Sequence, residues 1–460
     1  MSKDKLSLRL WFVYIIVGLA GQLAWAIENM YLNTYITYLN FEAPAGQGFD
    51  YSLLIAVTTA SSAIVATLTT IFIGALTDKV GHRKYFIAIG YLIWGITTAM
   101  FGLFNVDNDS SFLRIAVSAY TAAVLIVVLD CVMTFFGSTA NDAAFNAYVT
   151  ENTPEQSRGK VEGVLQVLSL LAMLIIFVGF NNLTTKEGGY RWDLFFYILG
   201  GLVMLVGLLS FFLIPKEKIK PEPVRRSYLN TLKDGFRPTM VKKNPSLYLL
   251  LLSYFVFACA CQIFFPYLLV YVERSCKILN SGAGLLTPFA IVMAVSLLGG
   301  SLLSVIVGLL GDKVGKNRMI FPSLLVFALG VLMMFFIPDI RSEDGRTVYA
   351  CFAGLVMIAG YVGVPTILNS LIRSKIPAGE EGTFMGVRMI FVVALPMCIG
   401  PFIGDALNEN LGETYTGTYG VTSFTPTRYD YLVALGFLLL ILLPLYFYFR
   451  LERKQTENVQ

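Results

Sequence analysis

The chain has 460 residues, of which 56% are hydrophobic and only 14% are charged, and its formal net charge is +4. A soluble protein of this length carries about 25% charged residues, so the composition excludes an ordinary soluble globular protein. The apolar residues occur in blocks of about 20 to 28, long enough to cross a hydrocarbon core about 30 Å thick as helices. The composition therefore predicts a polytopic membrane protein, and nothing in its modest positive charge indicates nucleic-acid binding.

Twelve such blocks follow one another along the chain. The fourth is too long for one simple span, and we expect its C-terminal part to extend past the membrane surface. The blocks cover residues 10–39, 52–77, 84–105, 113–149, 161–183, 192–214, 247–272, 285–310, 319–337, 348–372, 384–407 and 431–449.

The distribution of Lys and Arg predicts the orientation of these blocks, because cytoplasmic loops carry an excess of both. With the N-terminus inside, the cytoplasmic segments hold 25 of the 34 Lys and Arg residues, and the outer loops hold eight. Only Arg388 then lies within a span. We therefore expect an integral protein of the plasma, or inner, membrane with both termini in the cytoplasm.

A basic segment separates the sixth block from the seventh. It reads "PKEKIKPEPVRRSYLNTLKDGFRPTMVKKNP" and has nine Lys and Arg against three Asp and Glu. Its charge suits an anionic membrane surface. We predict an N-terminal six-helix half over residues 1–214, a cytoplasmic linker over 215–246, and a C-terminal six-helix half over 247–460.

The two halves repeat each other at two places. "GALTDKVGHRK" follows the second block and "GLLGDKVGKNR" the eighth, while "FNAYVTENTPEQSRGKVEGV" and "LNSLIRSKIPAGEEGTFMGV" follow the fourth and tenth. Two independent matches indicate an internal duplication, and parallel half-repeats are one established transporter architecture. The pairs in the first match are Gly74 and Gly308, Asp78 and Asp312, Lys79 and Lys313, Val80 and Val314, and Gly81 and Gly315.

The doubled G-x-x-x-D-K-x-G-x-[RK]-[RK] loop resembles the signature of the major facilitator superfamily, and the resemblance spans essentially the whole chain. It implies an all-α membrane protein of twelve transmembrane helices in two pseudo-symmetric halves, a secondary active transporter that works by alternating access. "GLAGQLAWAIENMYLNTYITYL" and "NDAAFNAYVTENTPEQSRGKVEGVLQ" are similar to segments of the glycoside–pentoside–hexuronide and sucrose/maltose cation symporters.

The repeated loop is a candidate gate at the cytoplasmic face. Glycine permits a tight backbone turn, and a carboxylate near a helix N-terminus is stabilised by up to about 1–2 kcal/mol. The resemblance pairs Asp78 with the start of the eleventh helix, and the repeat suggests the start of the fifth for Asp312. The alternative is an ordinary turn that obeys the positive-inside rule. The predicted gating residues are Asp78, Gly81, Arg83, Asp312, Gly315 and Arg388.

Three acidic residues, Glu28, Asp130 and Asp142, lie at the predicted depth of the membrane. A charge at the bilayer centre costs about 2.5–3.5 kcal/mol on insertion scales, so such groups persist where they face a cavity, bind a cation or become protonated. We therefore predict that they couple transport to a proton, with sodium as the second choice. The alternatives are a structural carboxylate at Glu28 and a gating or structural role for Asp142.

The resemblance supports Asp130 in particular, because the sucrose/maltose symporters have an acidic residue in the fourth helix that is linked to proton coupling. Two features of the family pattern are absent. No arginine lies in the fifth block between Lys160 and Lys186, and no acidic residue lies in the second block before Asp78.

Sugar binding needs hydrogen-bonding groups for the hydroxyls and an aromatic face against the C–H surface, and the first block offers both at helical spacing. The alternative for the aromatic residues is packing against lipid or other helices. The predicted substrate-binding residues are Gln22, Trp25, Glu28, Asn29, Tyr31, Asn33, Tyr254, Gln262, Tyr361 and Asn369.

The chain has one histidine and six cysteines, and it lacks H-E-x-x-H, G-x-S-x-G and phosphate-cradling motifs. We therefore expect no enzymatic activity, no cofactor and no metal. The expected partners are a small-molecule substrate, with a sugar or glycoside favoured, a proton or sodium ion, and membrane lipids around a monomer. The main alternative function is a multidrug or lipid exporter of the same fold that runs as a proton antiporter. A channel finds no support in the repeat, and a receptor-like sensor that does not transport is a further alternative, which net substrate flux would distinguish.

Overall fold

The computed structural model describes most of the chain, and nearly all of what it describes is helical. Ten of the described helices are long and apolar enough to cross a membrane. Two shorter apolar helices, Val167–Gly179 and Pro288–Gly299, lie where the fifth and eighth spans are predicted. The predicted all-α membrane fold is confirmed. The described residues are 6–39, 50–80, 82–104, 119–154, 158–184, 191–215, 236–278, 287–300, 302–303, 314–376, 384, 387–416 and 422–457.

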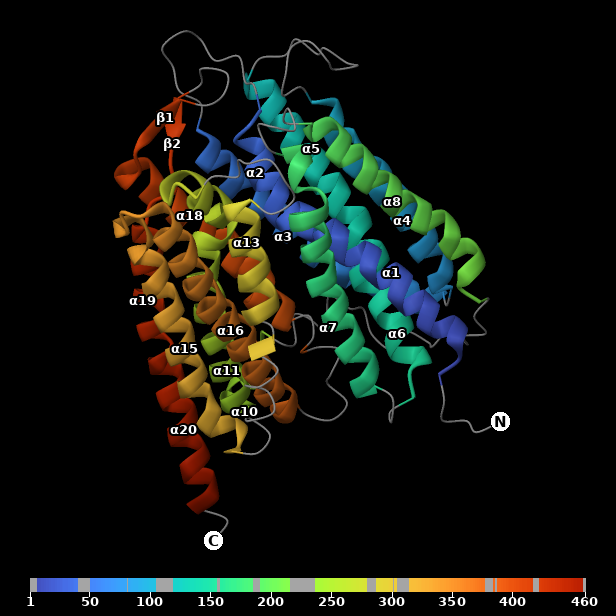
Figure 1. The fold of residues 1–460 in the computed structure, drawn as a ribbon. Coiled ribbons are helices and arrows are strands. Elements are labelled where there is room, and N and C mark those ends of the chain that lie inside the picture. Colours follow the sequence, from blue (N-terminus) through green and yellow to red (C-terminus); the bar gives the residue numbers. More distant parts are fainter. Residues whose placement is uncertain are drawn as a thin grey trace. The chain divides into compact units, whose positions relative to one another are not determined.

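The chain divides into two compact units. The first comprises Met1–Arg225, Ser281–Leu285 and Tyr415–Ser423. Its helical segments (Figure 1) are α1 (Leu8–Ala26), η1 (Ile27–Tyr31), α2 (Leu32–Ile36), α3 (Tyr51–Val80), α4 (Arg83–Met100), η2 (Phe101–Leu103), α5 (Ala119–Gly137), η3 (Ser138–Phe145), α6 (Asn146–Asn152), α7 (Arg158–Leu174), η5 (Ile175–Gly179), η6 (Asn181–Thr184) and α8 (Trp192–Leu213).

The second unit comprises Arg226–Asn280, Leu286–Thr414 and Phe424–Gln460. In the sequence between α18 and α19, two short strands, β1 (Thr414–Thr416) and β2 (Thr422–Phe424), form a two-stranded sheet, and most of their residues belong to the first unit. The helical segments are α10 (Pro238–Lys243), α11 (Pro245–Phe264), η7 (Phe265–Tyr267), α12 (Leu268–Val270), η8 (Tyr271–Ser275), α13 (Pro288–Ala294), η9 (Val295–Gly299), α15 (Lys316–Phe336), η10 (Ile337–Asp339), α16 (Glu343–Lys375), η11 (Ile390–Ala394), α18 (Leu395–Leu411), α19 (Tyr429–Leu440) and α20 (Leu442–Glu457).

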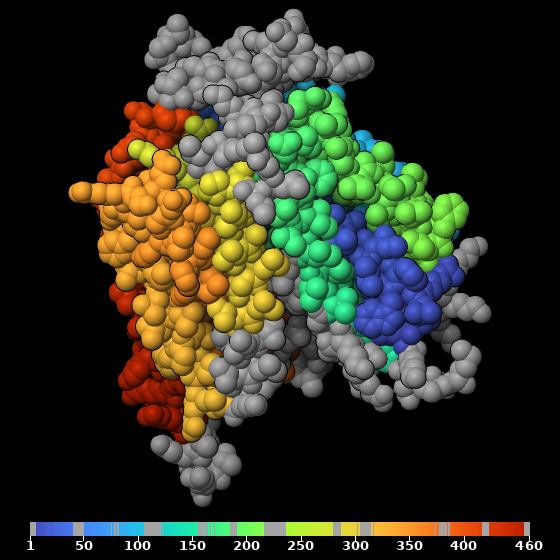
Figure 2. All heavy atoms as spheres, viewed as in Figure 1, coloured from blue at the N-terminus to red at the C-terminus, as the bar shows by residue number. Residues whose placement is uncertain are grey.

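Glycines let the helices of the first unit approach each other closely. The helices α4 and α8 lie side by side (Figure 1), and a Cβ atom on Gly200 would lie only 2.6 Å from the backbone nitrogen of Ala99. Small residues allow this approach in a membrane, where lipid tails supply no hydrophobic drive for helix association. The side chains of α1 and α7 likewise pack together at the surface (Figure 2).

The second unit uses glycine in the same way. A Cβ atom on Gly360 of α16 would lie 2.5 Å from the backbone nitrogen and from the Cβ of Phe327 on α15. A Cβ atom on Gly400 of α18 would lie 2.5 Å from the Cβ of Gln262 on α11. Both contacts fix the distance between neighbouring helices, and the second one also positions Gln262, which is a predicted substrate residue.

Neighbouring glycines on α8 provide a matched test of this packing. Gly200→Ala introduces a methyl group against the backbone of α4, and overpacking of this kind costs about 1–3 kcal/mol. A Cβ atom on Gly201 meets nothing within 4 Å, so Gly201→Ala is expected to leave stability nearly unchanged. Thermal unfolding in detergent is expected to show a clearly lower midpoint for Gly200→Ala only. Equal midpoints for the two variants would contradict the packing account.

Candidate functional site

Two buried carboxyl groups in the first unit each accept a hydrogen bond from a hydroxyl group. Glu28 lies in η1, and its Oε1 accepts from Thr134 Oγ1 at 2.8 Å. Asp130, one turn before Thr134 on α5, accepts at Oδ2 from Ser62 Oγ of α3. The exposed fractions of Glu28 and Asp130 are only 7% and 1%. These contacts join η1, which continues α1, to α3 and α5.

The two carboxyls and Asp142 form one electrostatic cluster. Asp130 and Asp142 both lie near enough to Glu28 for their charges to interact with it. In the described part of the chain, no Lys, Arg or His forms an ion pair with any of the three. Neither Glu28 Oε2 nor Asp130 Oδ1 has a hydrogen-bond partner among the described residues. Glu28 and Asp130 are so deeply buried that as carboxylates they need a counter-charge, which a proton or a bound cation supplies.

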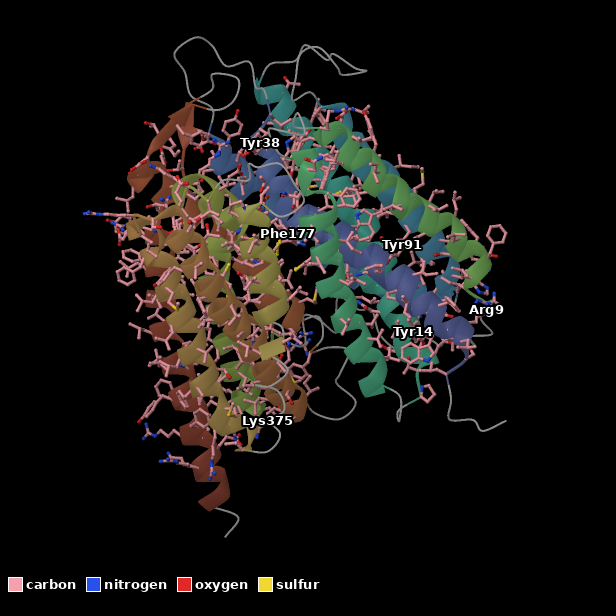
Figure 3. The ribbon with its side chains drawn as sticks, viewed as in Figure 1. Arg9, Tyr14, Tyr38, Tyr91, Phe177 and Lys375 are labelled. Carbon is pink, nitrogen blue, oxygen red and sulfur yellow. The ribbon has the colours of Figure 1, made fainter. Side chains whose placement is uncertain are left out.

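A second series of hydrogen-bonding groups lies between Asp142 and α1. Asn141 Nδ2 donates to Asp142 Oδ1 at 3.3 Å, and Tyr91 of α4 donates to Asn141 Oδ1 at 3.0 Å. The Tyr91 hydroxyl also lies 3.0 Å from the Val17 carbonyl oxygen of α1 (Figure 3). Gly21 makes room for this chain, since a Cβ there would lie 2.5 Å from the Tyr91 hydroxyl. Asp142 is therefore bonded to its neighbour Asn141, which Tyr91 in turn holds from α4.

Three predicted substrate residues of the first helix lie on one half-buried face. Gln22, Trp25 and Asn29 are spaced by three and four residues and keep part of their surface exposed. Gln22 Oε1 accepts a hydrogen bond from Ser169 Oγ of α7 at 2.7 Å. Trp25 packs edge-on against Trp94, with ring centroids 5.2 Å apart. This face combines amides with an aromatic surface.

Besides Glu28, the two remaining predicted substrate residues of this helix, Tyr31 and Asn33, are buried. The Tyr31 ring packs against Phe177 and Phe195, with centroids 5.3 and 5.1 Å away. Asn33 Nδ2 donates to the Asn29 carbonyl of its own helix at 3.3 Å. The surroundings of Tyr31 fit the alternative that the aromatic residues pack against other helices. A substrate contact at Tyr31 or Asn33 stays a prediction.

The second unit has a polar cluster of its own. Arg388 Nε donates to Asn369 Oδ1 of α16 at 3.1 Å, and the Tyr254 hydroxyl of α11 lies within reach of both side chains. Nearby on α16, Tyr361 stacks on Phe265, with centroids 5.2 Å apart. The structure thus places Arg388, a predicted gate residue, beside two predicted substrate residues.

The predicted gate is described only in part. Gly81 and Asp312 lie outside the described residues, and Asp78 is described as a backbone position near the end of α3 but not in its side chain. Gly315 precedes α15 with a φ of +100°, a left-handed conformation that favours glycine. This backbone matches the predicted tight turn.

Arg83, the remaining gate residue, is buried and bonded to two neighbouring helices. Its guanidinium forms an ion pair with Glu151 of α6, with Nε 2.8 Å from Oε2, and Nη1 donates to Thr77 Oγ1 of α3 at 2.9 Å. The arginine thereby connects the ends of α3, α4 and α6. Glu151 lies in the second repeated segment, which is the only sequence signal that points to it.

Sequence reasoning missed most of the residues that contact the acidic groups. Thr134 carries a signal, because it follows Asp130 by one helical turn. Apart from Glu151, the others are small or uncharged polar residues on apolar helices, where the same residue types usually serve packing. The missed residues are Ser62, Thr77, Tyr91, Thr134, Asn141, Glu151 and Ser169.

Among the described residues, no three His, Cys, Asp or Glu side chains converge in a metal site.

Comparison with known proteins assigns the chain to one family. The family model described as "Major Facilitator Superfamily" matches residues 10–401. A search of curated proteins found no match.

Three solved structures share the fold at low sequence identity. The nucleoside transporter NupG is 13% identical, with a TM-score of 0.66 over 96% of this chain and 99% of its own. The D-xylose-proton symporter is 16% identical, with a TM-score of 0.67 over 95% and 96%. A bacterial homolog of the human lysosomal transporter Spinster is 14% identical, with a TM-score of 0.58 over 96% of both chains.

With a family match over most of its length and apolar helices that suit a bilayer, this chain is an integral membrane protein that belongs to the Major Facilitator Superfamily of transporters.

Proposed function

We propose that this protein is a cation-coupled symporter that takes up a sugar or glycoside by alternating access, with a proton as the first choice of coupling ion. The observation that carries the proposal is the cluster of the buried Glu28 and Asp130 with the half-buried Asp142, which forms no ion pair with any described basic residue. Two fold neighbours, a D-xylose-proton symporter and a nucleoside transporter, support a small hydroxyl-rich substrate.

The hydroxyl contacts suit a carboxyl group that gains and loses a proton. Thr134 and Ser62 each donate to one oxygen of Glu28 or Asp130, which leaves the other oxygen able to carry the proton. In the neutral form these contacts hold α1, α3 and α5 together. Loss of the proton creates like charges at short range in a poorly solvated site, which favours separation of the helices. Sodium is the second choice, because the same carboxylate and hydroxyl oxygens suit a hard cation.

Each unit contributes its own candidate groups for the substrate. In the first unit, the half-exposed face of Gln22, Trp25 and Asn29 offers amides beside an aromatic ring. In the second unit, Arg388 and Asn369 offer donors and an acceptor for hydroxyl groups. Such neighbouring polar and aromatic groups fit a sugar better than a lipophilic drug, which favours import of a sugar over the exporter alternative.

The proposed organisation follows the sequence. Residues 1–214 and 247–460 form the two halves, residues 215–246 form a cytoplasmic linker, and both termini lie in the cytoplasm of a protein that acts as a monomer in the plasma membrane. Asp78 and Asp312 then act with the glycine turns as a gate on the cytoplasmic face. The ion pair of Arg83 with Glu151 keeps the helix ends of the first unit together beside that gate.

Substrate-driven proton movement tests the coupling. In proteoliposomes with a pH-sensitive dye inside, substrate uptake by the wild type is expected to acidify the lumen. Glu28→Gln and Asp130→Asn remove the titrating groups, so both are expected to lose this signal and accumulation against a gradient while retaining substrate exchange.

The matched controls for this experiment are Glu343→Gln and Asp344→Asn, since both carboxylates are exposed at the start of α16. They are expected to acidify the lumen as the wild type does. Intact proton movement in both cluster variants would refute the assignment to Glu28 and Asp130. Absence of substrate-linked proton movement in the wild type would refute proton coupling and leave sodium to be tested in the same vesicles.

A thermal-shift screen tests the substrate class. A ligand at 100 times its Kd stabilises the folded protein by about 2.7 kcal/mol, so a sugar or glycoside is expected to raise the unfolding temperature, and nucleosides and lipophilic cations are not. Trp25→Ala is expected to abolish the shift, and Trp11→Ala, near the start of the same helix, to preserve it. Stabilisation by lipophilic compounds alone would favour the exporter.

A substitution at Asp78 tests the gate. Asp78→Asn keeps the size of the side chain but removes the charge, so it is expected to slow net uptake in reconstituted vesicles while expression stays near the wild-type level. The exposed Asp344→Asn serves as the control and is expected to transport normally. An unchanged uptake rate in Asp78→Asn would remove the gating assignment.

A further inference from the structure

A groove of about 640 Å³ opens in the second unit between α10, α11 and α20. Its walls are mostly apolar and include Leu249 and Leu252 of α11 and Phe447 of α20. Leu252 and Phe447 are 39% and 43% exposed, so large hydrophobic side chains face outward along the groove. A surface of this kind suits a hydrocarbon chain.

The polar end of the groove is basic. Arg450 and Lys454 line it one helical turn apart, so both lie on the same side of α20, and both side chains are exposed. The apolar span that contains α20 ends at Lys454. Figure 1 shows α20 projecting past the lower ends of α15 and α16. The groove therefore runs from the hydrocarbon region to its edge, with the cations at the edge.

Among the described residues, the neighbouring carboxylate of Glu452 forms its ion pair with Lys375 and not with Arg450 or Lys454. Both oxygens of Glu452 lie 2.7 Å from Lys375 Nζ at the end of α16 (Figure 3), and Ser246 Oγ donates to Oε1 at 3.1 Å. On the other side of the groove, the last turn of α10 adds the exposed Lys242 and Lys243. The open end of the groove thus has an excess of positive charge.

The first and last helices of the first unit, α1 and α8, do not contact each other in the way that α11 and α20 of the second unit do. There α8 ends at Leu213, and Arg9 of α1 donates from Nε to the Leu213 carbonyl and from Nη2 to the Phe212 carbonyl, both at 2.8 Å (Figure 3). The guanidinium of Arg9 is therefore used to hydrogen-bond the last carbonyl oxygens of α8. In the second unit, α20 continues as a helix, and two of its basic residues, Arg450 and Lys454, line the groove instead.

We propose that this groove binds one anionic phospholipid, with the phosphate against Arg450 and Lys454 and an acyl chain along Leu249, Leu252 and Phe447. The order of charge and apolar surface along the groove matches that of a lipid in a bilayer, and basic pockets between membrane helices bind such headgroups. The proposal does not depend on the identity of the transported substrate.

Lipid titration followed by native mass spectrometry tests the proposal. Delipidated protein in uncharged detergent is titrated with dioleoylphosphatidylglycerol, which is expected to bind with one site much stronger than the rest. Arg450→Gln and Lys454→Gln are each expected to weaken this site about five-fold, the equivalent of about 1 kcal/mol per basic residue. Arg453→Gln removes the same charge from an exposed neighbour that does not line the groove, and it is expected to bind as the wild type does.

Two further measurements distinguish a lipid from simpler explanations. Leu252→Trp fills the apolar wall without changing the charge and is expected to abolish the strong site, while inorganic phosphate is expected not to compete. Equal binding of dioleoylphosphatidylcholine, equal losses in Arg450→Gln and Arg453→Gln, or effective competition by inorganic phosphate would each overturn the proposal. Size-exclusion chromatography of each variant confirms that it is folded before titration.

Discussion

Burying carboxyl groups in an apolar helical unit imposes a constraint that the surrounding contacts have to meet. Glu28 and Asp130 lie almost entirely out of solvent, and charges in such surroundings are costly unless a partner or a proton neutralises them. The described residues supply two hydroxyl donors, Thr134 and Ser62, and no cation. The way α1, α3 and α5 meet therefore depends on whether these carboxyls are neutral, which connects the charge of the site to the packing of three helices.

Close packing through glycine is what brings the polar groups together. Gly21 leaves space for the Tyr91 hydroxyl and for Asn141, so this hydroxyl lies within hydrogen-bond distance of both the Val17 carbonyl of α1 and Asn141, the neighbour of Asp142. Gly200 does the same for the backbones of α4 and α8. In lipid, such contacts replace the hydrophobic drive of a soluble core, so the rigidity of each unit and the placement of its polar side chains have a common origin.

The sequence predicts the elements of this structure better than their contacts. Block lengths and doubled loops were sufficient for the helices and the superfamily, and an acidic residue in an apolar block pointed to Glu28 and Asp130. Ser62 and Glu151 were missed, because a contact between helices depends on how each helix is rotated, which periodicity in a mixed apolar block does not define. For the same reason, the substrate residues predicted in the first helix do not share one environment. Trp25 lies on the half-buried face, whereas Tyr31 packs against other aromatic rings.

The central claim is that Glu28 and Asp130 take up and release a proton during transport. Infrared difference spectroscopy measures this directly, since a protonated carboxyl has a C=O stretching band that an ionised carboxylate lacks. Adding substrate to the reconstituted protein is expected to change the intensity of such a band in the wild type, and Glu28→Gln and Asp130→Asn are expected to remove that change in part or in full. A spectrum without any change in a carboxylic acid band, or one that is identical in both variants, would contradict the account.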